Sequence, residues 1–136
     1  MPRYYRLRVC AEAKRLTLQV YRCVVGFPKH EQFGLSSQVT RAAVSVGANV
    51  VEGQRRSTTK DFRSFVCTAE GSLAELQYLL EIAKELDYLT QESFDEVWQQ
   101  SIEVEKMLQA LRLGLDRKMH EQTAKPPVAQ PVTRNP

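Results

Sequence analysis

Residues 58–83 read TTKDFRSFVCTAEGSLAELQYLLEIA, and this stretch decides the fold class. Its apolar residues recur in alternating steps of four and three, which places them on one face of an α-helix. An unbroken alternation of this kind is typical of the seam of a helical bundle or coiled coil. Thr58 stands three positions before Asp61, a short relative of the capping box, so we predict that a long helix begins here. The predicted buried stripe comprises Phe62, Val66, Ala69, Leu73, Leu76, Leu80 and Ala83.

The same spacing recurs in three further segments, so the sequence predicts four helices. The first covers residues 7–25 and ends at the Gly-Phe-Pro of residues 26–28, because glycine caps a helix and proline cannot continue it. The second covers residues 35–53, and the fourth begins after a Thr90 cap and runs to about Leu115. The predicted buried residues are Leu7, Cys10, Ala11, Leu18, Tyr21, Val24 and Val25 in the first helix; Leu35, Val39, Ala42, Ala43, Val46, Asn49 and Val50 in the second; and Phe94, Val97, Ser101, Val104, Leu108, Leu111 and Leu115 in the fourth.

Four helices with short connections predict an all-α fold, an antiparallel up-down-up-down four-helix bundle, because a short connection forces neighbouring helices to run in opposite directions. A chain of 136 residues is long enough for one domain with one core. We assign residues 1–119 to the bundle, including a short N-terminal extension. Residues 120–136 contain four prolines and no apolar periodicity, so we predict a flexible tail there.

The composition excludes several classes of protein. No apolar run approaches the roughly 20 residues of a membrane span, and the first residues do not resemble a secretion signal, so we expect a cytoplasmic protein. His30 and His120 stand in no metal-ligand spacing, the three cysteines form no CxxC pair, and no catalytic motif occurs. We therefore expect no metal, no cofactor and no enzymatic activity.

Charge is distributed unevenly along the chain, although the formal net charge is only +3. Residues 1–60 contain 11 Lys or Arg and 3 Asp or Glu, whereas residues 61–136 contain 8 and 13. The basic first part predicts either a surface for phosphate or a surface complementary to the acidic part of a neighbouring copy. Four cations gather in the turn before the third helix, where no core requires them, so a solvated turn and a phosphate contact are both open interpretations. These cations are Arg55, Arg56, Lys60 and Arg63.

Polar and small residues interrupt the apolar stripes of the second and third predicted helices. Asn49 and Glu52 lie on or near a buried face, where an unpaired polar group costs stability, so we expect them to cap a loop or to hydrogen-bond across the bundle. An ion pair between Arg41 and Glu75 would fix the register of the two helices. Small residues let helix backbones approach closely, and we assign this role to three of them. They are Gly53, Gly71 and Ser72.

The chain contains four motifs, FPKHEQFGL (27–35), QVTRAAVSVGANVVEG (38–53), QRRSTTKDF (54–62) and AEGSLAEL (69–76), followed by a helix ending near ELDYL (85–89). Through these motifs it resembles the four-helix-bundle proteins encoded in intervening sequences of bacterial large-subunit ribosomal RNA genes, a family that includes the accessory variability proteins of diversity-generating retroelements. The resemblance covers nearly all of residues 5–116. Two departures are visible: Thr40 and Arg41 stand where the family often has two arginines, and Gly47 stands where it often has proline. The first departure lowers the local positive charge.

The resemblance implies a bundle that assembles into a ring-like homopentamer, has no known catalytic activity, and binds nucleic acid or a reverse transcriptase. We expect contacts to RNA or DNA phosphates without base reading, because the aromatic and glycine pattern of an RNA-recognition fold is absent. An accessory subunit of a retroelement reverse transcriptase is one form of this hypothesis, and a purely structural protein–protein adaptor is the alternative. The residues expected to contact nucleic acid are Arg3, Arg6, Arg8, Lys14, Arg15, Arg55, Arg56, Lys60 and Arg63.

Overall fold

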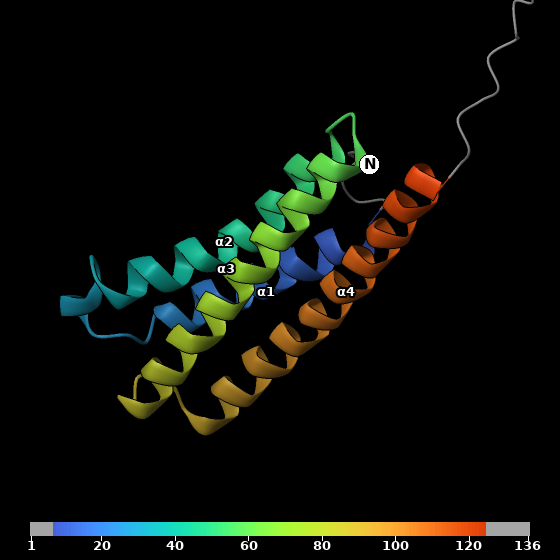
Figure 1. Ribbon diagram of the computed structural model, residues 1–136. Helices are drawn as coiled ribbons and strands as arrows, with labels where there is room; N and C mark the ends of the chain where they lie inside the picture. The colour runs from blue at the N-terminus through green and yellow to red at the C-terminus, as the bar shows by residue number, and fades with distance from the viewer. Residues whose placement is uncertain (1–6, 125–136) are drawn as a thin grey trace, which may run out of the picture.

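The computed structural model of the protein describes residues 7–124, which form four α-helices and one short 3-10 helix (Figure 1). Successive helices pack against each other and the last returns to the first, which closes an up-down-up-down bundle and confirms the predicted all-α class. No helix in this part of the chain combines the length and the apolar character needed to cross a membrane. In chain order the elements are α1 (Arg8–Val24), η2 (Lys29–Glu31), α2 (Leu35–Gln54), α3 (Thr59–Glu85) and α4 (Gln91–Ala124).

Side-chain caps begin three of the helices. Thr58 Oγ1 accepts a hydrogen bond of 3.1 Å from the backbone N–H of Asp61, and Thr90 Oγ1 accepts one of 3.1 Å from the backbone N–H three residues later. Both caps confirm the sequence prediction. Before α2 the cap is a carboxylate, because Glu31 Oε1 accepts a hydrogen bond of 3.2 Å from the backbone N–H of Leu35. Each cap satisfies a backbone donor that a helix start would otherwise leave unpaired.

Helix α4 is longer than the sequence analysis expected. It continues to Ala124, well beyond the predicted end near Leu115, so the beginning of the predicted tail 120–136 is helical. No glycine or proline follows Leu115 before Pro126, and the residues in between favour helix even without a buried face. Proline disfavours helix in the residue before it, so the sequence provides its stop signal only there. The rest of the predicted tail, 125–136, lies outside the described residues.

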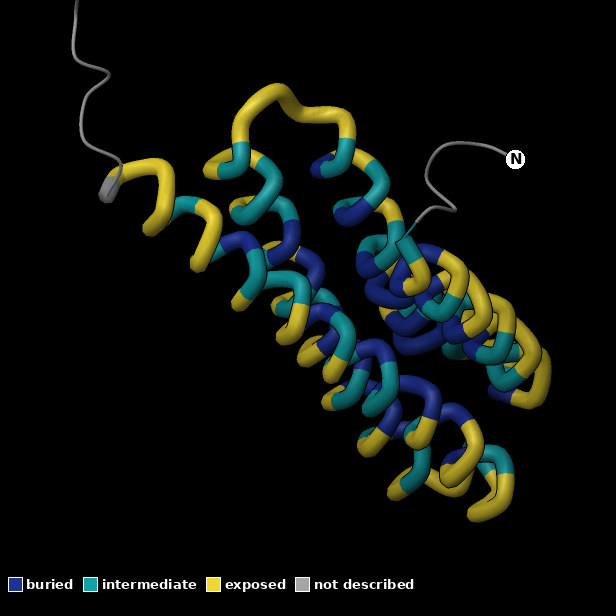
Figure 2. Tube along the Cα trace, turned by 90° about the vertical axis from the view of Figure 1, so that its right-hand side faces the viewer, coloured by how far each residue is buried: buried dark blue, intermediate teal, exposed yellow. Residues whose placement is uncertain are grey.

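Side chains from all four helices form one core. Figure 2 marks the buried positions along each of these helices in dark blue. On α2, α3 and α4 the predicted stripes are confirmed: only Asn49, Phe62 and Leu111 are half-buried, and every other residue of these stripes is buried. These three helices therefore present the face that the spacing of their apolar residues indicated.

For α1 the predicted face is wrong at four of its seven residues, whereas Cys10 is buried and Leu7 and Val24 pack against the core. Leu18 is 47% exposed, Tyr21 51% and Val25 87%, and Ala11 is exposed as well. Apolar residues occur at helical spacing on two sides of α1, and most of the predicted residues belong to the outer set, which shares Cys10 with the inner one. The residues that enter the core from α1 are Val9, Cys10, Ala13, Leu16 and Val20.

Helices α2 and α3 approach closely at Gly53, as predicted. A Cβ atom on Gly53 would lie 2.7 Å from the Cβ of Phe65 and 2.9 Å from Cδ1 of Phe62. Real Cβ contacts are essentially never this short, so only glycine fits at this position without a shift of α3.

Hydrogen bonds also join α2 to α3, and they include two residues that the sequence analysis singled out. The hydroxyl groups of Ser45 and Ser72 lie 2.8 Å apart. Asn49 Nδ2 donates to Ser45 Oγ at 2.9 Å and to the Ser45 backbone oxygen at 2.8 Å. Asn49 and Ser72 therefore belong to a polar chain across the bundle, which is one of the two roles expected for Asn49.

Three further predictions about this contact, which involve four residues, are corrected by the structure. Gly71 is exposed, and a Cβ atom there would meet nothing within 4 Å, so it is not a close-contact residue within the chain. Glu52 is 56% exposed and does not lie near the buried face. Arg41 and Glu75 are both exposed and form no ion pair among the described residues. The register of α2 and α3 turns these four positions outward.

Candidate nucleic-acid interface

Four helix termini meet at one end of the bundle. The start of α1, the end of α2, the start of α3 and the end of α4 lie there because the helices alternate in direction (Figure 1). Gln54 Nε2 lies 2.9 Å from the sulfur of Cys10 and ties the end of α2 to α1. Gln122 Nε2 donates to Thr59 Oγ1 at 3.4 Å and ties α4 to the start of α3.

The two ends of the bundle differ in charge. The end just described, which we call the basic end, comprises residues 7–15, 45–71 and 107–124 and contains ten Lys or Arg and six Asp or Glu. The opposite, acidic end comprises residues 16–44 and 72–106 and contains five and ten. The uneven charge along the sequence thus becomes a separation of charge along the bundle, which attracts a polyanion to one end.

Three predicted contact residues are available at the basic end. Arg8, Arg55 and Lys60 are exposed, and none of them forms an ion pair with another residue of 7–124. Arg8 lies in the first turn of α1 and Lys60 in the first turn of α3, so each places positive charge at the positive end of a helix dipole. That placement disfavours folding, so the fold does not account for these cations.

Two other predicted contact residues are held by the protein itself. Arg56 pairs with Glu52 at 2.6 Å, and its guanidinium carbon lies 4.8 Å from the centroid of the Phe65 ring. Arg63 of α3 pairs with Asp116 of α4, and this hydrogen bond raises the pKa of Arg63. A phosphate would have to displace these partners, so Arg56 and Arg63 are weaker candidates than the cations without partners.

The structure adds two cations that the sequence analysis missed. Arg117 and Lys118 are exposed on the last turns of α4, at the basic end. They follow Leu115, near which the sequence predicts the end of the fourth helix. The uninterrupted run of helix-forming residues up to Pro126 is the sequence signal that would have included them.

The remaining predicted contact residues lie nearer the middle of the bundle or outside the described residues. Lys14 and Arg15 are exposed on α1, nearly two turns further along the helix than Arg8. Lys14 lines a groove between α1 and α2. Arg3 and Arg6 lie outside the described residues.

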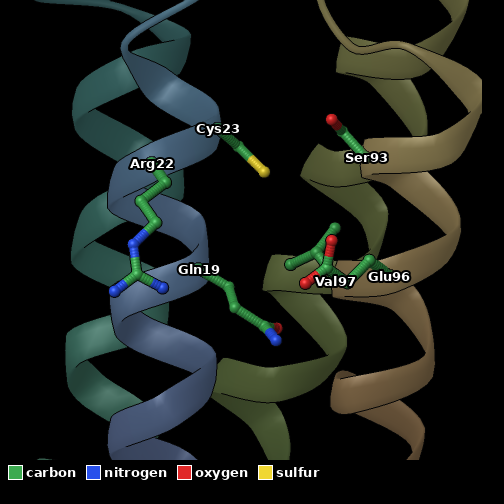
Figure 3. Close-up of a pocket in the computed structure, with 6 residues that line it drawn as sticks. All are labelled: Gln19, Arg22, Cys23, Ser93, Glu96 and Val97. Atoms are coloured by element: carbon green, nitrogen blue, oxygen red, sulfur yellow. The ribbon is translucent and has the colours of Figure 1, made fainter.

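A small cavity of about 140 Å³ lies between α1 and α4, at the acidic end (Figure 3). The side-chain oxygen of Gln19 is buried there and has no hydrogen-bond partner among the described residues. The six lining residues come from the two helices in equal number: Gln19, Arg22 and Cys23 from α1, and Ser93, Glu96 and Val97 from α4.

The Cys23 thiol in this cavity is not an activated nucleophile. Burial raises the pKa of the Cys23 thiol, and the negative charge of Glu96 raises it further. A thiol with a raised pKa is protonated near neutral pH and is a poor nucleophile. Within residues 7–124, no group of His, Cys, Asp and Glu is arranged to hold a metal ion. The basic end is therefore the better candidate for a functional site.

Comparisons with known proteins agree with this architecture. A family model described as 23S rRNA-intervening sequence protein matches residues 5–110. The fold is similar to a crystal structure of a protein with unknown function from the S23 ribosomal protein family of Bacteroides thetaiotaomicron. The TM-score is 0.71 at 23% sequence identity, and the match covers 76% of this chain and 97% of that one. No curated protein matches the chain.

Proposed function

Because the chain belongs to the 23S rRNA-intervening sequence protein family, we propose that it is a non-enzymatic homo-oligomer, a pentamer, whose basic end binds nucleic acid. RNA is the preferred partner in this proposal. The cytoplasm, where RNA is abundant, is the proposed location.

The observation that carries the proposal is the separation of charge along the bundle. Exposed cations converge on the basic end from three helices and a turn, and two of them oppose a helix dipole. A phosphate backbone would offset that cost, because it brings the negative charge that a helix N-terminus favours. The cations concerned are Arg8, Arg55, Lys60, Arg117 and Lys118.

The same surface favours phosphate contacts over base contacts. The large aromatic residues that are well exposed in residues 7–124 are Tyr21, Phe33 and Tyr78, and all three belong to the acidic end. Single-stranded bases are held by stacking on exposed aromatic rings, which the basic end does not offer. Binding that depends on the sugar-phosphate backbone varies little with sequence.

An accessory subunit of a retroelement reverse transcriptase is one form of this function. The resemblance to accessory variability proteins supports it, and a ring of basic ends would hold template RNA beside the polymerase. The genomic neighbourhood decides between this form and a gene inside a ribosomal RNA insertion, because a reverse-transcriptase gene would adjoin only the former.

A structural adaptor without nucleic-acid binding is the second candidate. The separation of charge favours it too, since the basic end of one copy complements the acidic end of another. In that case raising the salt concentration dissociates the assembly, and RNA has no measurable affinity even in dilute buffer.

The decisive experiment compares two variants with the same net charge. The first carries Arg55→Gln and Lys60→Gln at the basic end, and the control carries Lys29→Gln and Lys106→Gln at the acidic end. Affinity for unrelated single-stranded RNA oligomers is measured by fluorescence anisotropy over a series of salt concentrations. Each lost phosphate contact lowers the slope of log affinity against log salt by about 0.7, so the first variant should lower it by roughly 1.4.

The control should keep the affinity and the slope of the unmodified protein. Adding Arg117→Gln and Lys118→Gln to the first variant should double the fall in slope, to about 2.8. Equal losses in the first variant and the control would show nonspecific attraction by overall charge. An unchanged affinity in the folded four-residue variant would exclude the basic end as the binding surface, whereas an unmodified protein with no measurable affinity for RNA would favour the adaptor.

A further inference from the structure

Helix α1 has a second apolar face that points away from the core. Ala11, Leu18, Tyr21 and Val25 are all exposed, and with Lys14 they follow steps of three and four. This spacing is that of a seam against another helix. The stripe extends over about 21 Å, which is four turns of helix. No element of residues 7–124 covers it.

A groove runs beside this stripe, between α1 and α2. Two adjoining hollows of about 240 and 360 Å³ share Val44, which is 44% exposed. Tyr21 lines one hollow, and Ala48 and Val51 line the other. The walls approach closely at the floor, because a Cβ atom on Gly47 would lie 3.3 Å from the Cβ of Ala13. The groove is thus an apolar surface bounded by two helices.

Helix α3 also carries an unpartnered face, on the far side of its contacts with the core. Cys67, Gly71, Ala74 and Tyr78 follow steps of four and three there, and the last three are exposed. Glycine within a helix weakens it, yet Gly71 relieves no crowding, because a Cβ atom there would meet nothing within 4 Å. A neighbour outside the chain that approaches the α3 backbone would explain this glycine.

The two faces are complementary in charge. All exposed charged residues of α1 are cations, and Arg41 adds another at the groove. From residue 64 to the end of α3, all exposed charged residues are acids, namely Glu75, Glu81 and Glu85. Opposite charges that face each other across an interface favour encounter and fix its register.

We propose that the outer face of α3 in one copy of the chain docks against α1 and the α1–α2 groove of the next copy. This inference rests on the homo-oligomer of the proposed function and assigns its interface. The contact joins different surfaces of the two copies, so it is heterologous and generates a ring when the rotation between copies closes. It uses the sides of the bundle and leaves Arg55, Lys60, Arg117 and Lys118 of the basic end outside the contact.

The first test places a carboxylate in the apolar stripe. Leu18→Glu should lower the mass measured by sedimentation velocity to that of a smaller species, with a loss of association of at least about tenfold. Leu113→Glu on α4 is the matched control, because Leu113 is 51% exposed and Leu18 is 47% exposed. The control should keep the assembly, and both variants should keep the helical circular dichroism.

The second test adds bulk to α3. Gly71→Leu has room within the chain and replaces glycine by a better helix former, so the chain should fold while the neighbouring copy is held off. Ala110→Leu, at an exposed position of α4, is the control and should assemble normally.

The third test exchanges the charges and touches no apolar contact. Glu75→Arg with Glu81→Arg should weaken association by at least about tenfold. Adding Arg22→Glu and Arg41→Glu to the same chain should restore it, because the charges of both faces are then inverted. If Gly71→Leu does not fold, this charge exchange still tests the α3 side of the interface.

The outcomes separate the interface from the function on which it rests. The interface is overturned, and the proposed function stands, if the unmodified chain assembles and the interface variants have the same assembled mass. These variants are Leu18→Glu, Gly71→Leu and the Glu75→Arg, Glu81→Arg pair. An unmodified chain that is monomeric at all concentrations overturns both the interface and the proposed oligomer. Loss of assembly in the three interface variants but not in the controls supports the interface.

Discussion

Helices α1 and α4 differ in how their apolar residues are divided between the inside and the outside of the bundle. On α4 the stripe that ends at Leu115 enters the core, and the well-exposed large apolar residue of that helix is Leu113. On α1, one apolar set enters the core and a second set at the same spacing faces outward. Periodicity therefore identifies each face of a helix that is suited to burial. A helix with two such faces, like α1, is suited to packing against partners on two sides.

The sharpest test of this difference replaces one inner and one outer leucine on each helix. Leu16→Ala on α1 and Leu108→Ala on α4 remove fully buried side chains and should each lower the free energy of unfolding by about 2 to 5 kcal/mol. Leu18→Ala and Leu113→Ala should each change it by less than about 0.5 kcal/mol. Urea titrations in the Glu75→Arg, Glu81→Arg background keep subunit contacts out of the measurement. A loss above 2 kcal/mol for Leu18→Ala would mean that its face belongs to the core.

A pair of glycines extends the comparison to α2 and α3. Gly53→Ala forces a methyl group against Phe65 and Phe62 and should destabilise the chain by about 1 to 3 kcal/mol. Gly71→Ala adds a methyl group in open space and should stabilise it by about 0.5 to 1 kcal/mol, because alanine favours helix. Thermal unfolding in the same background gives both values. If both substitutions changed the stability in the same direction, the assignment of Gly53 to an inner face and Gly71 to an outer face would be wrong.

The inner contact between α1 and α4 is partly polar and gives a smaller effect. Gln100 Nε2 donates to the backbone oxygen of Glu12 at 2.9 Å and to Glu12 Oε2 at 2.8 Å. Gln100→Ala removes both hydrogen bonds at a buried site. It should lower the free energy of unfolding, measured by urea titration, by about 1 to 2 kcal/mol. Gln99→Ala, at an exposed neighbouring position, should leave the midpoint in place. Equal costs for the two glutamines would show that these hydrogen bonds do not hold α1 to α4.

The smallest expected effect concerns the loop after α1 and the turn before α4. Tyr88 donates a hydrogen bond of 3.0 Å to Glu31 Oε2, and burial, followed by Glu31, raises the pKa of Tyr88. The folded state therefore keeps the phenol proton at a pH where the unfolded chain loses it. The stability that the Tyr88 phenol contributes is fully present below the pKa of about 10 that tyrosine has in the unfolded chain. This contribution falls as the pH rises through the raised pKa of Tyr88 in the folded state. In Tyr88→Phe the free energy of unfolding, measured from neutral to alkaline pH, should fall less steeply with pH. If the fall is as steep as in the unmodified protein, another group causes it.

The sequence predicted most of the fold because the relevant signals are local. The caps at Thr58 and Thr90 and the stripes of α2, α3 and α4 depend on residues a few positions apart. The inner face of α1 could not be chosen in this way, since both apolar sets fit the period and the decision comes from the other three helices. The end of α4 was set too early, because a helix without a buried face still continues when no breaker follows.

The candidate site was only partly predictable, for a different reason. A count of charges finds the cluster around Arg55, but whether each cation has a partner depends on distant parts of the chain. Arg63 meets Asp116, which is 53 residues away in sequence. Arg117 and Lys118 join the same end only because α4 extends beside the start of α3. Whether a cation is available to a phosphate therefore depends on how the whole bundle packs.

The separation of charge gives the molecule a permanent electric dipole moment along its long axis. Near a polyanion such a dipole exerts a torque, so the chain turns its basic end forward before any contact forms. In a ring whose subunits are related by one rotation axis, the components of these dipoles along that axis add, whereas dihedral symmetry would cancel them. A cyclic assembly would therefore have one strongly positive and one strongly negative rim, and electric birefringence would distinguish it from a dihedral assembly of the same mass.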